Sequence, residues 1–421
     1  MSYYKSFFSW QLAANSPNRD VSLNSLFDKK NSHGSTSLFS ISLFDVRYFR
    51  QWILACSSTI VLLTFLLLMQ QSVNRQQPET RSAGLAADNP KDAGITKIVR
   101  LADALKASLK EDQLARLQLQ YSREDAAKWS NLPASFRGAQ RVGLNFGAMT
   151  SAQVQTAKAL MQAVAGTKVN EGWDELQQLL NADDYLNTSG GGPEYGAAHY
   201  YIALLGTPAA KGIFEIQFGG HHLAFANTYK DGVLVGATPS FRGVEPFGNF
   251  TVNNKTNQPL NQEQAALSAM LTSLSGTELA SAQLGRTFSD LMVGPRRDGQ
   301  FPNTPSGIKC SNLSAAQKQL VLNAIKTYVD DIDDADAKVF LKRYTDELDN
   351  TYISCSGTTT VTAQNDYVRI DGPSVWIEYS SQHGIILPGT HPHSVWRDKT
   401  KDYGGMEGGQ GGTAPRIALV R

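Results

Sequence analysis

Two kinds of hydrophobic spacing follow one another along this chain, and they predict helices gathered in blocks around a few groups of strands. Apolar residues recur at helical spacing over residues 95–120, 150–164 and 172–180, and again over 261–274, 277–284, 314–329 and 335–348. A short helix is also expected at 195–205. Helix blocks around sequence-distant strands favour an α+β fold with a mainly antiparallel sheet over a repeating βαβ pattern.

The predicted strands show alternation of apolar and polar residues. Residues 214–218 (FEIQF) have the period of a half-buried strand, and 221–229 continue as strand to a hairpin turn at 230–232 and a return strand at 233–238. Gly219 and Gly220 should permit a bulge or a close approach of the backbone. Residues 366–378 (DYVRIDGPSVWIE) predict two strands joined by a turn, 391–398 (HPHSVWRD) follow them, and 294–307 read as a long polar loop.

The uncharged run 52–69 (WILACSSTIVLLTFLLLM) has about the length of a hydrocarbon crossing. Arg47 and Arg50 precede it, whereas the charges after it are sparse and mixed, so the positive-inside rule places the N-terminus in the cytoplasm. We therefore expect a poorly ordered cytoplasmic tail (1–50), a single-pass inner-membrane anchor (51–70), a linker (71–93), one periplasmic α+β domain (94–405) and a Gly-rich tail (406–421). Secretion after signal cleavage is the alternative.

Composition narrows the function classes. Lys+Arg total 39 and Asp+Glu 38, a balance that predicts no nucleic-acid partner. The three cysteines form no C-x-x-C pair, which disfavours zinc ribbons, c-type haem attachment and thioredoxin chemistry. Cys310 and Cys355 either form a disulfide in an oxidising compartment or are two free thiols.

Histidines gather in the predicted strands. A His-x-His pair on extended chain, His391 and His393, places both rings on one face and suits a divalent transition metal such as Cu, Fe or Zn. Adjacent histidines on a strand point to opposite faces, so one of His221 and His222 would join them. His222 shares its face with two alanines and is the expected third ligand. His199 and His383 are weaker candidates.

A carboxylate is expected beside the histidines. Glu378 shares a strand face with Trp376 among apolar neighbours, and an unpaired buried charge is expensive, so it should pair with a metal, a histidine or Arg369. There it would act as a ligand or a general base. A histidine that binds a metal through one ring nitrogen donates the N–H of its other ring nitrogen to an acceptor. Glu245, Asp371 and Asp398 are candidates for this acceptor. His221, Arg369 and Arg397 complete the residues expected around the metal or its substrate.

Three function classes follow from these residues. The first is a membrane-anchored metalloenzyme that performs metal-assisted hydrolysis or a copper or iron oxidation. The second is a non-catalytic module that binds a metal or a small molecule. The third is a structural envelope protein, in which the histidine rings only bond backbone groups, Arg397 and Asp398 pair structurally, and Pro392 marks an exposed or edge position. The acidic run 330–336 lacks the Gly and the terminal Glu of an EF-hand and indicates a solvated helix junction.

Four separated motifs carry a family resemblance. They are Gly220–Leu223 (GHHL), Thr238–Pro246 (TPSFRGVEP), Tyr367–Pro373 (YVRIDGP), and His391–Asp398 (HPHSVWRD) with Asp402–Gly404 (DYG). In this order they resemble an uncharacterised bacterial and fungal family catalogued as domain of unknown function 3500. The likeness covers roughly residues 129–405. It implies a domain boundary but no established reaction, and it does not extend to the apolar run 52–69.

Overall fold

The computed structural model describes residues 94–406, except positions 137 and 253. The described residues belong to one compact unit, Ala83–Arg421. The expected cytoplasmic tail, membrane anchor and linker, and the Gly-rich tail beyond residue 406, lie outside the described residues. Within 94–406, none of the helices combines the length and the apolar character that crossing a membrane requires.

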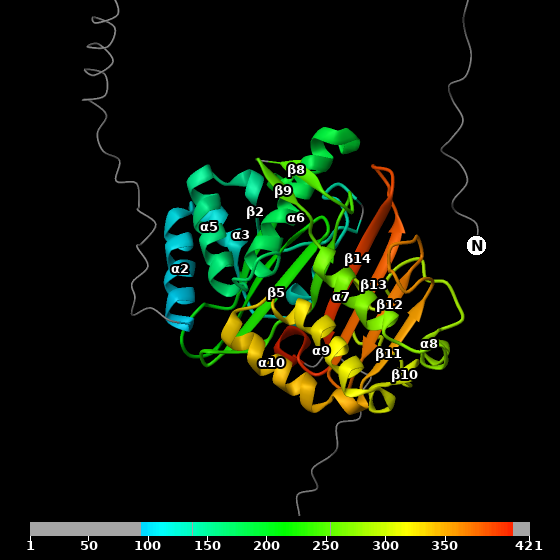
Figure 1. Ribbon diagram of the computed structural model, residues 1–421. Coiled ribbons are helices and arrows are strands. Elements are labelled where there is room, and N and C mark those ends of the chain that lie inside the picture. Colours follow the sequence, from blue (N-terminus) through cyan, green and yellow to red (C-terminus); the bar gives the residue numbers. More distant parts are fainter. Residues whose placement is uncertain (1–93, 137, 253, 407–421) are drawn as a thin grey trace, which may run out of the picture. The chain divides into compact units, whose positions relative to one another are not determined.

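A twelve-stranded sheet organises the domain (Figure 1). Its strands follow the order β1-β3-β4-β5-β7-β14-β13-β12-β11-β10, with β2 paired to β3 and β6 to β5. Their bounds are β1 Gln118–Leu119, β2 Leu144–Asn145, β3 Tyr201–Leu205, β4 Ile213–Gly220, β5 Leu223–Lys230, β6 Val233–Gly236, β7 Ser240–Gly243, β10 Ile308–Lys309, β11 Tyr352–Ser356, β12 Tyr367–Asp371, β13 Val375–His383 and β14 Thr390–Asp398. The pairing is antiparallel except between β1 and β3, and a separate hairpin joins β8 Phe250–Val252 to β9 Lys255–Asn257.

Helices cover one face of this sheet (Figure 1). They are α2 Ile95–Ser108, α3 Glu111–Leu117, α5 Ser151–Val164, α6 Gly172–Leu186, α7 Asn261–Thr272, α8 Gly276–Ala282, α9 Ala315–Val329 and α10 Asp334–Asp346, with short helical turns between them. The one-turn helix α4 Arg123–Ala126 instead packs on the other face through Ala126. The main core joins helix residues such as Leu160 and Ile325 to strand residues such as Phe218 and Trp396. The predicted α+β fold with a mainly antiparallel sheet of sequence-distant strands is therefore confirmed.

Irregular segments cover part of the other face. Phe288, in the segment that joins α8 to β10, stacks on Tyr367 of β12 with ring centroids 3.8 Å apart. Phe301 of the same segment meets the Trp376 ring on β13 edge to face at 5.4 Å. A second buried cluster on this side includes Trp129. This segment, which includes the polar loop predicted at 294–307, thus covers the sheet face that carries the histidine pair of β14.

Three local predictions are wrong. Residues 201–205 form strand β3 and not a helix, because an apolar run buried inside a sheet has no periodicity that separates it from a buried helix. The helical pattern of 95–120 breaks at residues 109–110, where the backbone N–H of Lys110 donates to the Gln113 side chain at 3.0 Å. Pro392 does not mark an edge, since β14 pairs with β13 on one side and with β7 on the other.

The predicted hairpin turn at 230–232 is confirmed. The turn after β5 has positive φ at Asp231 and at Gly232, as a tight hairpin requires. Cys310 and Cys355 are both buried, and the structure has them as free thiols.

Candidate metal centre

His221 and His222 occupy the two-residue turn between β4 and β5. The expectation that they alternate along a strand is wrong, because Gly220 already pairs with Leu223 across the hairpin. His222 has φ 61°, so the turn rather than a pleat sets the direction of its side chain. Its backbone N–H donates to the carbonyl of Asn131 at 3.2 Å, and its carbonyl accepts from Gly243 at 2.8 Å. These bonds fix the turn against its neighbours.

The glycine pair before this turn permits a close approach, as expected. A Cβ on Gly220 would lie 2.6 Å from ring atoms of Tyr200, and one on Gly219 would lie 2.6 Å from the Leu223 carbonyl. The hydroxyl of Tyr200 in turn donates to the His221 carbonyl. Tyr200 thus packs against the turn and donates a hydrogen bond to it. Only glycine at position 220 leaves room for this close contact.

His391 and His393 lie on β14 and project from one face of the sheet, with ring centroids 4.7 Å apart. Gly243 of β7 lies directly opposite His393. A Cβ at Gly243 would stand 2.9 Å from Cδ2 of His393 and 3.0 Å from Cδ2 of His222. The missing side chain therefore provides the space in which rings from β14 and from the β4–β5 turn meet.

The three rings converge on a common point. Nε2 of His391 lies 2.8 Å from Nε2 of His222, and each of the three histidines offers one ring nitrogen within 4.8 Å of the others. All three residues are at most 6% exposed. Nε2 of His393 is buried and has no hydrogen-bond partner. The predicted histidine site thus exists as a group of inward-facing nitrogens.

Carboxylates stand behind two of the rings. Nδ1 of His391 lies 3.8 Å from Oε2 of Glu245, whose other oxygen accepts from the backbone N–H groups of Ile386 and Leu387, each at 2.6 Å. Nδ1 of His393 lies 3.1 Å from Oδ1 of Asp290 and 2.7 Å from the Gln382 amide. With Asp290 as acceptor, Nδ1 of His393 carries the proton and its Nε2 lone pair is free. Ligating histidines have this arrangement.

Electrostatics keep the rings in the form that binds metal. Burial lowers the pKa of His222 well below its usual value, and the other histidines lower it further. Burial and the rings of His393 and His221 lower the pKa of His391 to about 3, although Asp290 opposes them. Both rings are neutral at pH 7, and neutral imidazole is the ligand form.

His221 packs against one of the three histidines. Its ring stacks on that of His222 with centroids 3.6 Å apart, and its Nδ1 lies 2.6 Å from Oδ1 of buried Asp183. It does not belong to the group of three inward-facing nitrogens. His199 and His383 lie outside this group as well, and His383 is exposed.

Glu378 is placed away from the three histidines. Its oxygens accept from the backbone of Met292 and Val293, from the Tyr367 hydroxyl and from Trp376 Nε1, all at 2.6–2.8 Å. This carboxylate therefore has its partners in the fold, and they are neither a histidine nor Arg369. Arg369 lies over the Trp376 ring, 5.2 Å from its centroid.

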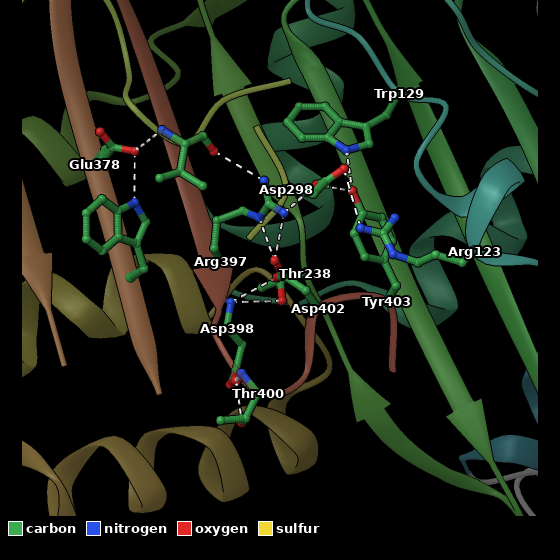
Figure 2. Close-up of polar contacts among 12 residues, drawn as sticks. Arg123, Trp129, Thr238, Asp298, Glu378, Arg397, Asp398, Thr400, Asp402 and Tyr403 are labelled. Carbon is green, nitrogen blue, oxygen red and sulfur yellow. Dashed lines mark hydrogen bonds and ion pairs between the residues drawn. The ribbon is translucent and has the colours of Figure 1, made fainter. Parts of the chain in front are cut away.

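The remaining sequence candidates belong to ion pairs elsewhere, some of them drawn in Figure 2. Arg397 is fully buried and donates to Asp298 at 2.6 Å and to Asp402 at 2.8 Å. Asp398 accepts from Arg343 and from the Tyr344 hydroxyl, while Asp371 pairs with Lys399. Arg397 and Asp398 do not pair with each other, because adjacent strand residues face opposite sides.

Residues that sequence reasoning missed complete the site. Asp290 and Gln382 reach the outer nitrogen of His393, Asp183 holds His221, and Gly243 makes room for the rings. Asp290 lies in an irregular segment with no pattern of its own, and Gly243 resembles any other strand glycine. Only strand pairing reveals that Gly243 faces a histidine.

Comparisons with known proteins give a family and no function. The family described as Protein of unknown function (DUF3500) matches residues 91–405. No curated protein matches this chain, and no solved structure matches it either. The match extends from just before α2 to the end of the described domain, and it contains all three inward-facing histidines and the carboxylates behind them. This chain belongs to the DUF3500 family.

Proposed function

We propose that this protein is a metalloenzyme in which His222, His391 and His393 bind one divalent transition metal ion. The convergence of the three ring nitrogens carries the proposal. Zn–N bonds of about 2.0–2.1 Å in a tetrahedral site separate nitrogens by about 3.3 Å. That value lies between the 2.8 Å contact and the 4.8 Å limit of the group. A metal would also satisfy His393 Nε2, whose burial without a partner costs about 1–3 kcal/mol.

The ligand set favours catalysis over a structural role. Among the described residues, no cysteine, carboxylate or fourth histidine joins the three nitrogens. Structural zinc sites are closed by four protein ligands, whereas three ligands leave a position for water, oxygen or a substrate. Imidazole nitrogens suit Zn, Cu and Fe and not Mg or Ca. The reaction class is thus metal-assisted hydrolysis or a copper or iron oxidation of a small molecule.

Metal analysis of the purified full chain tests the proposal. The wild type should hold about one equivalent of metal per chain, lose it to a chelator and regain it from Zn²⁺ or Cu²⁺. His391→Ala and His393→Ala should each lose the metal. His383→Ala is the matched control, because His383 is exposed at the end of β13. A folded wild type that takes up no metal after chelation and reloading overturns the proposal.

The second candidate is a module that holds a metal without turnover. The low exposure of the rings, 5% for His222, 2% for His391 and 6% for His393, favours it because a substrate would have little access. Visible spectra of the Co²⁺-loaded protein separate the candidates. Azide should shift the Co²⁺ bands if the fourth position accepts outside ligands, and it should leave them unchanged in a closed site.

The location of the domain is a separate proposal that rests on the sequence. The apolar run 52–69 with Arg47 and Arg50 before it supports a single-pass anchor and a domain outside the cytoplasm. Protease added to intact spheroplasts should then degrade the domain. Protection of the domain until the cells are lysed would contradict this location.

A further inference from the structure

A small cleft lies between strands β3 and β4 and the residues 128–130 and 141–142 that pack against them. Its enclosed volume is about 10 Å³, which is the space of about one water-sized group. Two of the residues that line it, Lys128 and Arg141, are cationic, and none of them is an aspartate or a glutamate. The three inward-facing histidines are not part of this lining. The cleft is therefore a second polar site, and its charge is positive.

Arg141 carries a charge in this cleft that no carboxylate of the described residues matches with an ion pair. The side chain is half-buried, and its Nη2 donates to the carbonyl of Ser130 at 2.9 Å and to that of Leu132, which are both neutral acceptors. Its Nε is buried and has no hydrogen-bond partner. Because charges that leave water are normally paired, this guanidinium favours an anion beside it.

The neighbouring charges have partners of their own. Lys128 pairs with both carboxylates of α4, at 2.8 Å and 3.3 Å from its Nζ. Burial lowers the pKa of Arg141, an effect that neighbouring groups such as Asp183 oppose only in part. Asp183 itself lies 2.6 Å from Nδ1 of His221, which is its own partner. The positive charge of Arg141 is thus the one that remains to be matched.

Two hydroxyl groups line the cleft together with this guanidinium. Tyr201 lies close enough to Arg141 for its hydroxyl to interact electrostatically with the guanidinium. Oγ of Ser130 accepts a backbone N–H at 3.2 Å, so its own hydrogen can donate to another group. The indole of Trp129 forms part of the wall and is held by its bond to the Tyr403 hydroxyl at 2.8 Å (Figure 2). The cleft therefore offers donors on a fixed wall.

We propose that this cleft binds a small monovalent anion, either a chloride ion or the carboxylate head of an organic acid. The anion accepts from the Arg141 guanidinium, with the hydroxyls of Tyr201 and Ser130 beside it. One unmatched guanidinium favours a single negative charge. The enclosed volume is too small for a whole sulfate or phosphate group. This site goes beyond the metal centre and does not depend on it.

Chloride NMR line widths, measured with the full chain, test the proposal. Chloride should show broadening that saturates at one site per chain. Acetate should displace chloride if the site takes a carboxylate head, whereas acetate without effect assigns the site to a monatomic anion. Sulfate at the same ionic strength should displace much less. Arg141→Gln should weaken chloride binding about tenfold or more, because the charged donor is lost, and Tyr201→Phe about twofold or more.

Arg116→Gln is the matched control, because Arg116 is an exposed arginine that pairs with Asp112 at the surface. It should bind chloride like the wild type, and melting temperatures should show which variants fold. Equal affinities of Arg141→Gln and Arg116→Gln overturn the proposal. If Arg141→Gln does not fold, Tyr201→Phe decides, and a chloride affinity equal to that of the wild type then overturns it.

Two further outcomes contradict the site. A folded wild type without saturable broadening has no such site, and displacement by sulfate as strong as by chloride itself would indicate only screening at the surface. Binding that persists in His391→Ala shows that the anion site is independent of the metal centre.

Discussion

Nε2 of His222 and Nε2 of His391 lie 2.8 Å apart, although 169 positions separate the two residues in the chain. One ring comes from a hairpin turn and the other from the start of a central strand. Strand β7 lies between these elements in the sheet, and its Gly243 leaves the space in which the rings meet. Predictions about the metal centre therefore concern both the ligands and the residues that hold them.

Gly243→Ala should damage the metal centre without touching a ligand. The new Cβ would stand about 3 Å from the rings of His222 and His393, closer than ordinary contact, so the rings must separate. We expect metal affinity to fall about tenfold or more and the free energy of unfolding to fall by about 1–3 kcal/mol. Competition with a chromogenic chelator measures the affinity.

Gly276→Ala is the control for this change, because no atom lies within 4 Å of the position that its Cβ would take. It should leave metal affinity and stability close to those of the wild type. If Gly243→Ala binds metal as tightly as Gly276→Ala, the glycine does not shape the site.

Asp290→Asn should weaken metal binding with little loss of stability. Asp290 is 49% exposed at its side chain, yet its Oδ1 lies 3.1 Å from Nδ1 of His393. Although burial opposes it, the His393 contact lowers the pKa of Asp290, so the carboxylate is charged at neutral pH. Replacing such an acceptor typically costs about 10–100-fold in metal affinity. The measurement is the metal dissociation constant.

The control for Asp290→Asn is Asp349→Asn. This change removes an exposed carboxylate that pairs with Lys318 and does not belong to the metal centre. Only the Asp290 change should alter the metal dissociation constant. Equal affinities for the two variants would show that Asp290 does not orient His393.

Glu378→Ala should unfold or strongly destabilise the protein. It would leave four donors, two from backbone and two from side chains, without their acceptor. Since a hydrogen bond to a charged group contributes about 1.5–3 kcal/mol, we expect a loss of about 3 kcal/mol or more in urea denaturation. Whatever variant protein folds should keep its metal. Normal stability together with lost metal would assign Glu378 to the site instead.

The free energy of unfolding should fall as pH rises from 4.5 to 7, and Glu215 should account for part of this fall. Burial raises the pKa of this fully buried carboxyl from 4.5 to about 7, while Thr228 and Arg123 oppose the shift. The folded state then binds the proton more tightly than the unfolded state. Its contribution is complete below pH 4.5 and is lost as pH rises through 7, a change of about 3 kcal/mol.

Glu215→Gln should remove this part of the pH dependence. Free energies of unfolding at pH 5 and pH 8 should differ less in the variant than in the wild type by about 3 kcal/mol. Glu124→Gln, at a side chain that is 84% exposed, serves as the control. An unchanged pH dependence in Glu215→Gln would show that this carboxyl is not neutral in the fold.

The sequence by itself determined the fold class and most of the elements. Period 2 in the His391–Asp398 run placed both histidines on one face, because side-chain direction on a strand is a local property. The spacing of glycines and polar residues likewise located the turn at Asp231 and Gly232. The family motifs marked the stretches that carry the site.

Only the tertiary structure decided which residues meet. Glu378 lies on the strand next to His391 and His393, yet an irregular segment distant in the chain supplies backbone donors that bind its charge. Asp290 of the same segment reaches His393 instead. The turn at His221 and His222 also depends on its packing against Tyr200. Local spacing sets the direction of a side chain, but partners across a sheet depend on register and on loops that have no periodicity.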